Sequence, residues 1–180
     1  MINPVAVQGI GVVALLVAIT IYQTNTRKSM LFLGMCACLL WAMHFFLLGA
    51  FTGAAMNFIS AIRCYVYNKI PPSKKNRWIA WSFIGVLGLA TALTWQGAIS
   101  LLPCVGSMSS VIASWQKRPI WMRRLGLLSS PPWFTYNLIS GSYPGMVIEV
   151  LLVTSNLIGQ YRFDFKPAFR NKLLRAARPT

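Results

Sequence analysis

Hydrophobic residues gather in seven long segments, and short polar or glycine-containing links join them. Apolar segments of roughly 17 to 25 residues are long enough to cross a bilayer as helices. The pattern therefore predicts an all-α membrane protein with seven transmembrane helices. The predicted spans are Val7–Tyr22, Met30–Leu48, Thr52–Tyr67, Trp78–Thr94, Ala98–Trp115, Leu125–Ser140 and Tyr143–Tyr161.

The composition argues against a soluble enzyme and against a soluble nucleic-acid-binding domain. Of the 180 residues, 56% are hydrophobic and 11% are charged, whereas about a quarter of the residues in a soluble domain are charged. The formal net charge of +15 would otherwise suggest nucleic acid as a partner, but that function needs a solvated basic face. Because the links are short, any chemistry or recognition must lie among the helices or at their ends.

The basic residues lie on one side of the predicted membrane topology. Sixteen of the seventeen Lys and Arg follow the first, third, fifth and seventh segments, and the alternate links are uncharged. The links after the first and fifth segments hold Arg27, Lys28, Lys117, Arg118, Arg123 and Arg124. The positive-inside rule then predicts an outer N-terminus and a cytoplasmic C-terminus. We expect the basic tail Phe163–Thr180 to lie on anionic lipid, where each cation contributes about 1 kcal/mol.

The two halves of the chain share an outline that indicates an internal repeat. Residues 9–70, shifted by 92, overlie residues 101–162 without a gap. The matching pairs are Gly34 with Gly126, Trp41 with Trp133, Gly49 with Gly141 and Gly53 with Gly145. Parallel repeats of three helices need one extra crossing between them, and Trp78–Thr94 supplies it. The alternative is seven helices with an accidental match of glycine and tryptophan.

This interpretation divides the chain into four parts. Residues 1–70 form the first three-helix repeat, 71–97 a basic loop and linker helix, 98–162 the second repeat, and 163–180 a basic tail. The same three-one-three order occurs in the sugar-transporting SWEET proteins. In such transporters the substrate binds between the repeats, near the middle of the bilayer.

One guanidinium and one carboxylate lie inside predicted spans, Arg63 in the third and Glu149 in the seventh. A charge there costs roughly 2.5–3.5 kcal/mol on insertion scales, so it usually faces the bundle interior and marks a functional site. The repeat places the two residues six positions apart in level, or about 9 Å along a helix. A direct pair and a bridging water or substrate are both compatible with that spacing. A buried ion pair that only fixes packing is the structural alternative.

Further polar and aromatic residues recur on the same helix faces. The candidate substrate-binding set is Asn57, Arg63, Glu149, Asn156, Asn137, Trp133, Trp41 and His44. Asn amides both donate and accept hydrogen bonds, which suits hydroxylated or amide-bearing solutes, and Trp rings offer stacking surfaces. The alternatives are interhelical hydrogen bonds, worth about 0.6 kcal/mol each, and packing. His44, the one histidine, either carries a proton or packs.

No motif for a metal, a cofactor or an enzyme is present in the sequence. The four cysteines, Cys36, Cys38, Cys64 and Cys104, lie within predicted spans without metal-ligand spacing, so we interpret them as small packing residues. There is no Ser–His–Asp set, no zinc spacing and no phosphate loop. We therefore expect a protein that is not an enzyme and that uses no cofactor.

Several short motifs resemble a known family. They are His44-Phe45-Phe46-Leu47-Leu48-Gly49, Ala61-Ile62-Arg63, Leu101-Leu102-Pro103, Trp133 through Asn137, Gly141-Ser142 and Glu149. Their order and spacing, from Gln8 to Arg162, are similar to those of the YgjV family of bacterial inner-membrane proteins. More distantly, the chain resembles the SWEET, PQ-loop and PnuC transporters. The resemblance implies a multi-pass protein of the inner membrane with a periplasmic N-terminus.

These observations lead to two hypotheses of different classes. The first is a small polar solute transporter or facilitator, with the solute bound between the repeats and alternating access by rocking of one repeat against the other. Arg63 and Glu149 depart from the uncharged pocket of SWEET proteins, which suggests a charged or zwitterionic solute. The second is a non-transporting membrane receptor or assembly subunit on the same fold. Either one is compatible with a monomer or a homo-oligomer.

Overall fold

The computed structural model describes residues 4–139, 143–167 and 169, and these residues contain helices and no strand. The helices are α1 Pro4–Ile21, α2 Arg27–Leu47, α3 Phe51–Lys69, α4 Arg77–Leu93, α5 Leu101–Ser114, α6 Pro119–Gly126, α7 Ser130–Ile139 and α8 Tyr143–Gln160. A 3₁₀ turn, Ala98–Ser100, precedes α5; a second, Leu127–Ser129, joins α6 to α7; and a π-helical segment, Tyr161–Phe165, follows α8. The all-α class predicted from the sequence is confirmed.

The sixth helical segment begins earlier than its hydrophobicity predicts. It starts at Pro119 rather than at Leu125 and runs through α6, the 3₁₀ turn and α7. Proline suits the first turn of a helix, because its missing N–H has no partner there in any case. Arg123 and Arg124 therefore lie on a helix and not in a link. Pro131 and Pro132 follow the 3₁₀ turn, within the first turn of α7.

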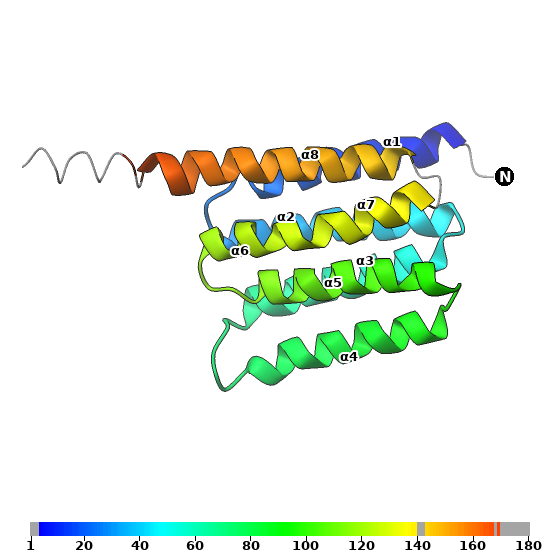
Figure 1. The fold of residues 1–180 in the computed structure, drawn as a ribbon, viewed down its shortest axis with the longest axis horizontal. Coiled ribbons are helices and arrows are strands. Elements are labelled where there is room, and N and C mark those ends of the chain that lie inside the picture. The colour runs from blue at the N-terminus through cyan, green and yellow to red at the C-terminus, as the bar shows by residue number, and fades with distance from the viewer. Residues whose placement is uncertain (1–3, 140–142, 168, 170–180) are drawn as a thin grey trace, which may run out of the picture.

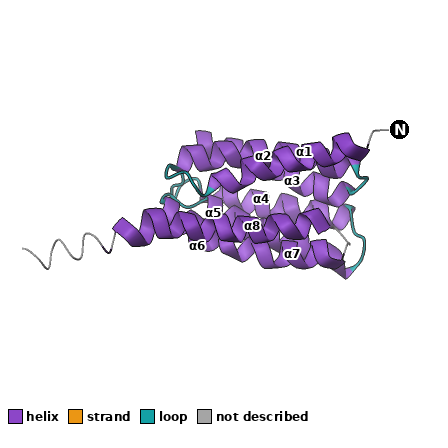
Figure 2. Ribbon diagram, turned by 90° about the horizontal axis from the view of Figure 1, so that it is seen from above, coloured by secondary structure: helices purple, strands orange, loops and turns teal. Residues whose placement is uncertain are grey.

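The helices form two layers (Figures 1 and 2). In one layer α2 packs between α1 and α3, and in the other α7 packs between α5 and α8. The layers meet at two edges, where α1 contacts α8 and where α3 contacts α5. Helix α4 lies outside, against α3 and α5. Six helical segments thus form a closed ring, and the fourth does not belong to it.

The links that hold the basic residues lie at one end of the bundle, which we call the basic end (Figure 1). It comprises residues 22–28, 69–77, 115–118 and 161–167. At the opposite end, Gly49 and Gly97 adopt positive φ angles of 76° and 99°, which favour glycine. Most of the predicted basic tail, residues 168 and 170–180, lies outside the described residues.

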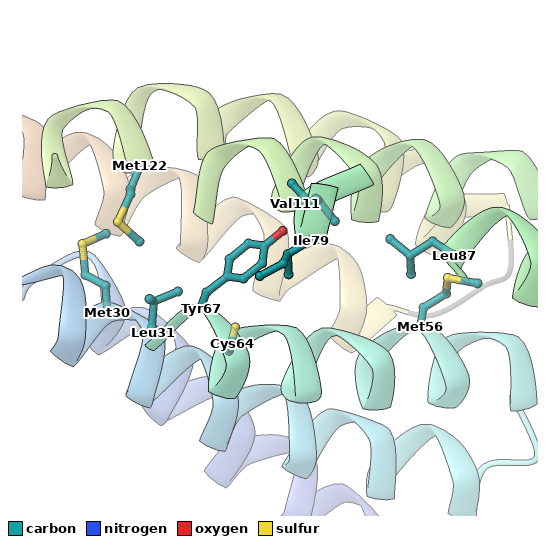
Figure 3. Close-up of a cluster of buried hydrophobic side chains, with 10 residues drawn as sticks. Met30, Leu31, Met56, Cys64, Tyr67, Ile79, Leu87, Val111 and Met122 are labelled. Carbon is teal, nitrogen blue, oxygen red and sulfur yellow. The ribbon is translucent and has the colours of Figure 1, made fainter. Parts of the chain in front are cut away.

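Between the layers and α4 lies a cluster of buried hydrophobic side chains (Figure 3). Tyr67 of α3, which is completely buried, stands at its centre and contacts the rings of Phe83 and Trp115. The other members come from five helices: Met30, Leu31, Met56, Cys64, Ile79, Ala80, Leu87, Val111 and Met122. This cluster fixes the edge at which α3, α4 and α5 meet.

The outer surface of the bundle is also apolar. Each of the eight α-helices carries exposed large hydrophobic side chains, among them Phe46, Trp78 and Leu93. By length and mean hydropathy, one described helix, Arg27–Leu47, is sufficient to cross a membrane. Three shorter apolar helices accompany it, Val7–Ile21, Arg77–Leu93 and Ala98–Ser114. Apolar patches of this extent are unusual on soluble monomers and indicate contact with a membrane or a partner.

Candidate functional site

A cavity of about 220 Å³ lies between the two layers. Residues of α1, α2, α3, α5, α6, α7 and α8 line it, and none of the described residues of α4 does. Most of its wall is apolar. Six of the eight predicted site residues contribute to the wall: Trp41, Asn57, Arg63, Trp133, Asn137 and Glu149. The ring of six segments therefore brings most of the predicted set to one place.

Arg63 is the buried cation of this cavity. Its side chain comes from α3 and is 5% exposed, and its Nε and Nη1 atoms have no hydrogen-bond partner. A buried donor without a partner costs about 1–3 kcal/mol, and more when it is charged. The guanidinium is therefore available for an anionic or hydrogen-bond-accepting group inside the cavity.

Glu149 of α8 lines the same cavity without pairing with Arg63. The ion pair found among the described residues joins Arg123 to Asp164 instead. Ser130 of α7 lines the cavity together with Glu149. Both residues also line a mostly apolar groove on the outer side of α7 and α8. Of the two arrangements compatible with the sequence, this structure does not adopt the direct pair.

The asparagines of the cavity differ in how their hydrogen bonds are satisfied. Asn57 Nδ2 donates to the Gly53 carbonyl one turn earlier in α3, at 2.9 Å. Asn137 of α7 is 3% exposed, and its Oδ1 has no partner. Asn137 lies against Gly145, where an added Cβ would overlap Oδ1 and lie 2.8 Å from Nδ2. Glycine at 145 is thus needed for the close approach of α7 and α8.

Trp41 and Trp133 line the cavity from opposite helix layers. Trp133 packs on Gly106 of α5, where a Cβ would lie 2.6 Å from its Cδ1. Trp41 meets the His44 ring edge-on, with the centroids 5.2 Å apart. Each indole therefore packs against a neighbouring residue and also lines the cavity.

Two predicted site residues do not line the cavity. His44 is 4% exposed, and its Nδ1 lies 3.0 Å from the Val7 carbonyl oxygen, while its ring packs on Gly11. Asn156 is 1% exposed and donates to the Arg123 carbonyl at 2.9 Å. His44 thus fastens α2 to α1, and Asn156 fastens α8 to α6.

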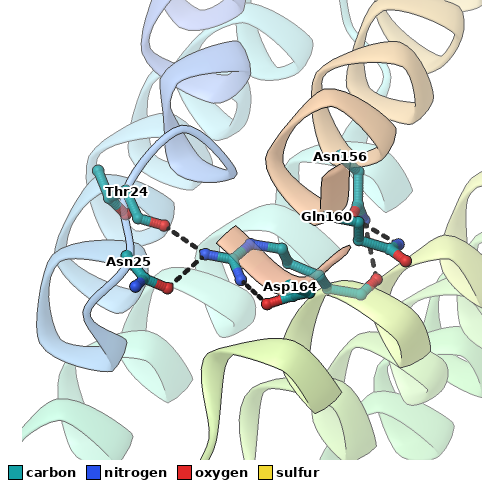
Figure 4. Close-up of polar contacts among 6 residues, drawn as sticks. Thr24, Asn25, Asn156, Gln160 and Asp164 are labelled. Carbon is teal, nitrogen blue, oxygen red and sulfur yellow. Dashed lines mark hydrogen bonds and ion pairs between the residues drawn. The ribbon is translucent and has the colours of Figure 1, made fainter. Parts of the chain in front are cut away.

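A polar network joins the layers at the basic end (Figure 4). Arg123 of α6, completely buried, donates to Asp164 Oδ1 at 2.9 Å, to the Thr24 carbonyl at 2.8 Å and to Asn25 Oδ1 at 3.0 Å. Gln160 donates to Asn156 Oδ1 at 3.1 Å beside it. The Phe163 ring lies 5.0 Å from the guanidinium. The network thus ties α6 to the end of α8 and to the link after α1.

Comparisons with known proteins agree with the motifs. The chain matches the family Imp-YgjV, described as bacterial inner membrane protein, over residues 5–166. It is 27% identical over 157 residues to "Inner membrane protein YgjV" of Escherichia coli (strain K12), which covers 87% of this chain and 83% of that protein. The chain belongs to this family of bacterial inner membrane proteins. The resemblance predicted from the sequence is confirmed, and with it a bacterial inner-membrane location. No solved structure matches the chain.

Sequence reasoning missed the importance of Arg123. Its position next to Arg124, in a basic region, made it one of sixteen apparently equivalent cations. One signal was available: Asp164 is one of only two acidic residues in the chain, and it stands within a strongly basic stretch. A single acid there indicates a specific cationic partner. It does not tell which of the surrounding cations that partner is.

Proposed function

We propose that this protein is a multi-pass transporter or facilitator of a small polar solute, which binds in the cavity between the two helix layers. One observation carries the proposal, namely the buried Arg63 guanidinium, whose Nε and Nη1 have no hydrogen-bond partner, in the wall of a cavity that the Glu149 carboxylate also lines. Charged groups inside a membrane bundle are costly, and they typically mark substrate or ion pathways. The apolar outer surface of the bundle suits the lipid environment that this function needs.

The layers support the three-one-three organisation. We assign α1, α2 and α3 to one repeat, α5 through α8 to the second, and α4 to the linker, as in SWEET-like transporters. The closed ring of six segments, with α4 outside it, favours this assignment. The single basic end favours a cytoplasmic C-terminus and a periplasmic N-terminus, by the positive-inside rule.

Alternating access would follow from rocking of one layer against the other. Hydrogen bonds cross between the layers at the basic end, where Gln23 donates to the Ser155 carbonyl at 2.9 Å. Arg27 and Arg123 also bridge the layers there. Opening of the cavity toward the cytoplasm would require these bonds to break, so we place one gate at this end.

The first experiment is a thermal-shift screen of the detergent-purified protein against sugars, vitamins, amino acids and nucleosides. A compound at 100 times its Kd stabilises the folded state by about 2.7 kcal/mol. Each compound that shifts the melting temperature is then tested for uptake into proteoliposomes. Uptake that exceeds the rate of empty liposomes supports the proposal. Binding without flux contradicts it and favours a receptor or assembly subunit.

A further inference from the structure

The polar atoms with which the cavity can bind a solute are of two kinds. Arg63 offers buried N–H donors that have no acceptor. Glu149 and Asn137 offer acceptors, a carboxylate and a buried Oδ1 without a partner. We propose that the cavity binds a zwitterionic solute, with its anionic group on Arg63 and its ammonium group on Glu149 and Asn137. The proposal rests on the transporter function and names the chemical class of its solute.

The donor site fits a planar anion. A guanidinium presents its N–H groups in a fixed fork that matches both oxygens of a carboxylate. Nε and Nη1 of Arg63 are the two nitrogens without partners, and each can donate to an oxygen of a bound anion. A carboxylate bound there satisfies both donors and neutralises the buried charge. The hydroxyl of a sugar accepts one such bond and leaves the charge uncompensated.

The acceptor site fits an ammonium group. A carboxylate has about four lone-pair positions, and the Glu149 carboxylate has no ion-pair partner among the described residues. Asn137 Oδ1 supplies a second acceptor from the neighbouring helix α7. An ammonium group has three donors and no acceptor, so it matches this set.

Charge balance distinguishes a zwitterion from the other solute classes. Arg63 and Glu149 carry opposite formal charges in one cavity and do not pair with each other. A zwitterion pairs with both, and the complex is neutral. An anion leaves Glu149 without a partner, and a cation leaves Arg63 without one. Because an isolated buried charge is strongly unfavourable, the zwitterion is the solute that this site stabilises best.

Much of the remaining wall of the cavity is apolar and aromatic. Trp41 and Trp133 line it together with Leu31, Ile148 and Leu152. The apolar part of the solute therefore meets hydrocarbon and indole surfaces, while its charged groups meet Arg63 and Glu149. Aminocarboxylates with an apolar body have this distribution.

The test uses matched probes on the detergent-purified protein and on proteoliposomes. The zwitterions are leucine, β-alanine, γ-aminobutyrate and 5-aminovalerate. N-acetyl-leucine keeps the anion only, leucinamide the cation only, and glucose neither. We expect at least one zwitterion to bind and be taken up, and N-acetyl-leucine and leucinamide to bind about tenfold or more weakly, because each lacks one charge pair. Equal binding of N-acetyl-leucine, or no binding of any zwitterion, overturns the proposal.

Variants assign the two ends. Arg63→Gln should remove the preference for a carboxylate, so that leucine and leucinamide bind with equal affinity. Glu149→Gln should remove the preference for an ammonium group, so that leucine and N-acetyl-leucine bind with equal affinity. Arg118→Gln, at an exposed cation outside the cavity, is the matched control and should bind as the unmodified protein does. Where Arg63→Gln does not fold, Arg63→Lys, which keeps the charge and loses the fork, should weaken all carboxylate probes in parallel. Unchanged selectivity in these variants overturns the proposal.

The two proposals fail in distinguishable ways. Binding of leucine or γ-aminobutyrate without uptake contradicts the transporter function and leaves the zwitterion site intact. Uptake of glucose or of N-acetyl-leucine alone, with no zwitterion bound, contradicts the solute class and leaves the transporter function intact.

Discussion

Arg27 and Arg123 hold corresponding places in the two layers. Arg27 lies at the start of α2, the middle helix of the first layer, and Arg123 lies in α6, which leads into the middle helix α7 of the second layer. Each side chain donates hydrogen bonds to both layers. Arg27 donates to the Tyr67 carbonyl of α3 at 2.7 Å and to the Gln116 carbonyl after α5 at 2.9 Å. Arg123 donates to Asp164 after α8 and to the Thr24 carbonyl after α1. Each arginine thus fastens the last helix of its own layer to the end of the first helix of the other.

Removal of the Arg123 guanidinium should destabilise the protein strongly. The Arg123→Gln variant leaves Asp164, whose side chain is 7% exposed, as a buried carboxylate without a cation. Breaking a buried ion pair from one side costs about 3–5 kcal/mol. We expect a clear drop in the melting temperature in detergent. Arg118→Gln, which removes an exposed cation of the same type, should stay within about 0.5 kcal/mol of the unmodified protein. Equal melting temperatures for the two variants would contradict the structural role of Arg123.

The Gly159→Ala substitution should separate α1 from α8. A Cβ at 159 would overlap the Tyr22 carbonyl oxygen and lie 3.1 Å from its carbonyl carbon, and backbone cannot rotate away as a side chain can. Overpacking of this kind costs about 1–3 kcal/mol. Gly85→Ala on α4, with no atom within 4 Å of the new Cβ, is the matched control and should be neutral or stabilising. The midpoint of thermal unfolding distinguishes the two variants. A Gly159→Ala protein that melts at the same temperature as the unmodified protein would contradict the prediction.

His44 should contribute to stability and not to proton transport. Its Nδ1 meets the Val7 carbonyl, and its ring covers Gly11, away from the cavity. For His44→Gln we expect a loss of about 1 kcal/mol of unfolding free energy, the usual net value of one hydrogen bond. The pH profile of solute uptake should keep its shape. A profile that flattens in this variant would restore a proton role for His44.

Loss of both arginine bridges should open the cavity at the basic end. Cys64 of α3 is buried and lines the cavity, so it reports access when Cys36, Cys38 and Cys104 are replaced by Ser. With the basic end on the cytoplasmic side, as proposed, we expect Arg27→Gln with Arg123→Gln in that background to speed the labelling of Cys64 by a membrane-impermeant maleimide in inside-out vesicles. Labelling from the periplasmic side should not increase. Unchanged rates from the cytoplasmic side would show that the bridges do not close that end.

Local sequence properties determined the helices, the single basic end and the family. Long apolar segments must become helices in a bilayer, because each backbone polar group needs a partner within its own segment. For this reason six of the seven predicted segments begin and end within a few residues of the described helices. The start of α6 was missed because Pro119 initiates a helix whose first turns are polar and basic, so hydrophobicity alone gave no signal there.

The residues that face the cavity were only partly predictable. Helical spacing places Glu149, Asn156 and Gln160 on one face of α8. Glu149 lines the cavity, whereas Asn156 donates to the Arg123 carbonyl and Gln160 donates to Asn156. The periodicity of polar residues defines one face of a helix, but it does not determine which neighbouring helix packs against each turn of that face. Arg123 and Asp164 are 41 residues apart in the chain, and Arg123 and Thr24 are 99 apart. Only the closed ring of helices brings them together, so tertiary packing decided which charges are buried, which are paired, and that two nitrogens of Arg63 are left without a partner.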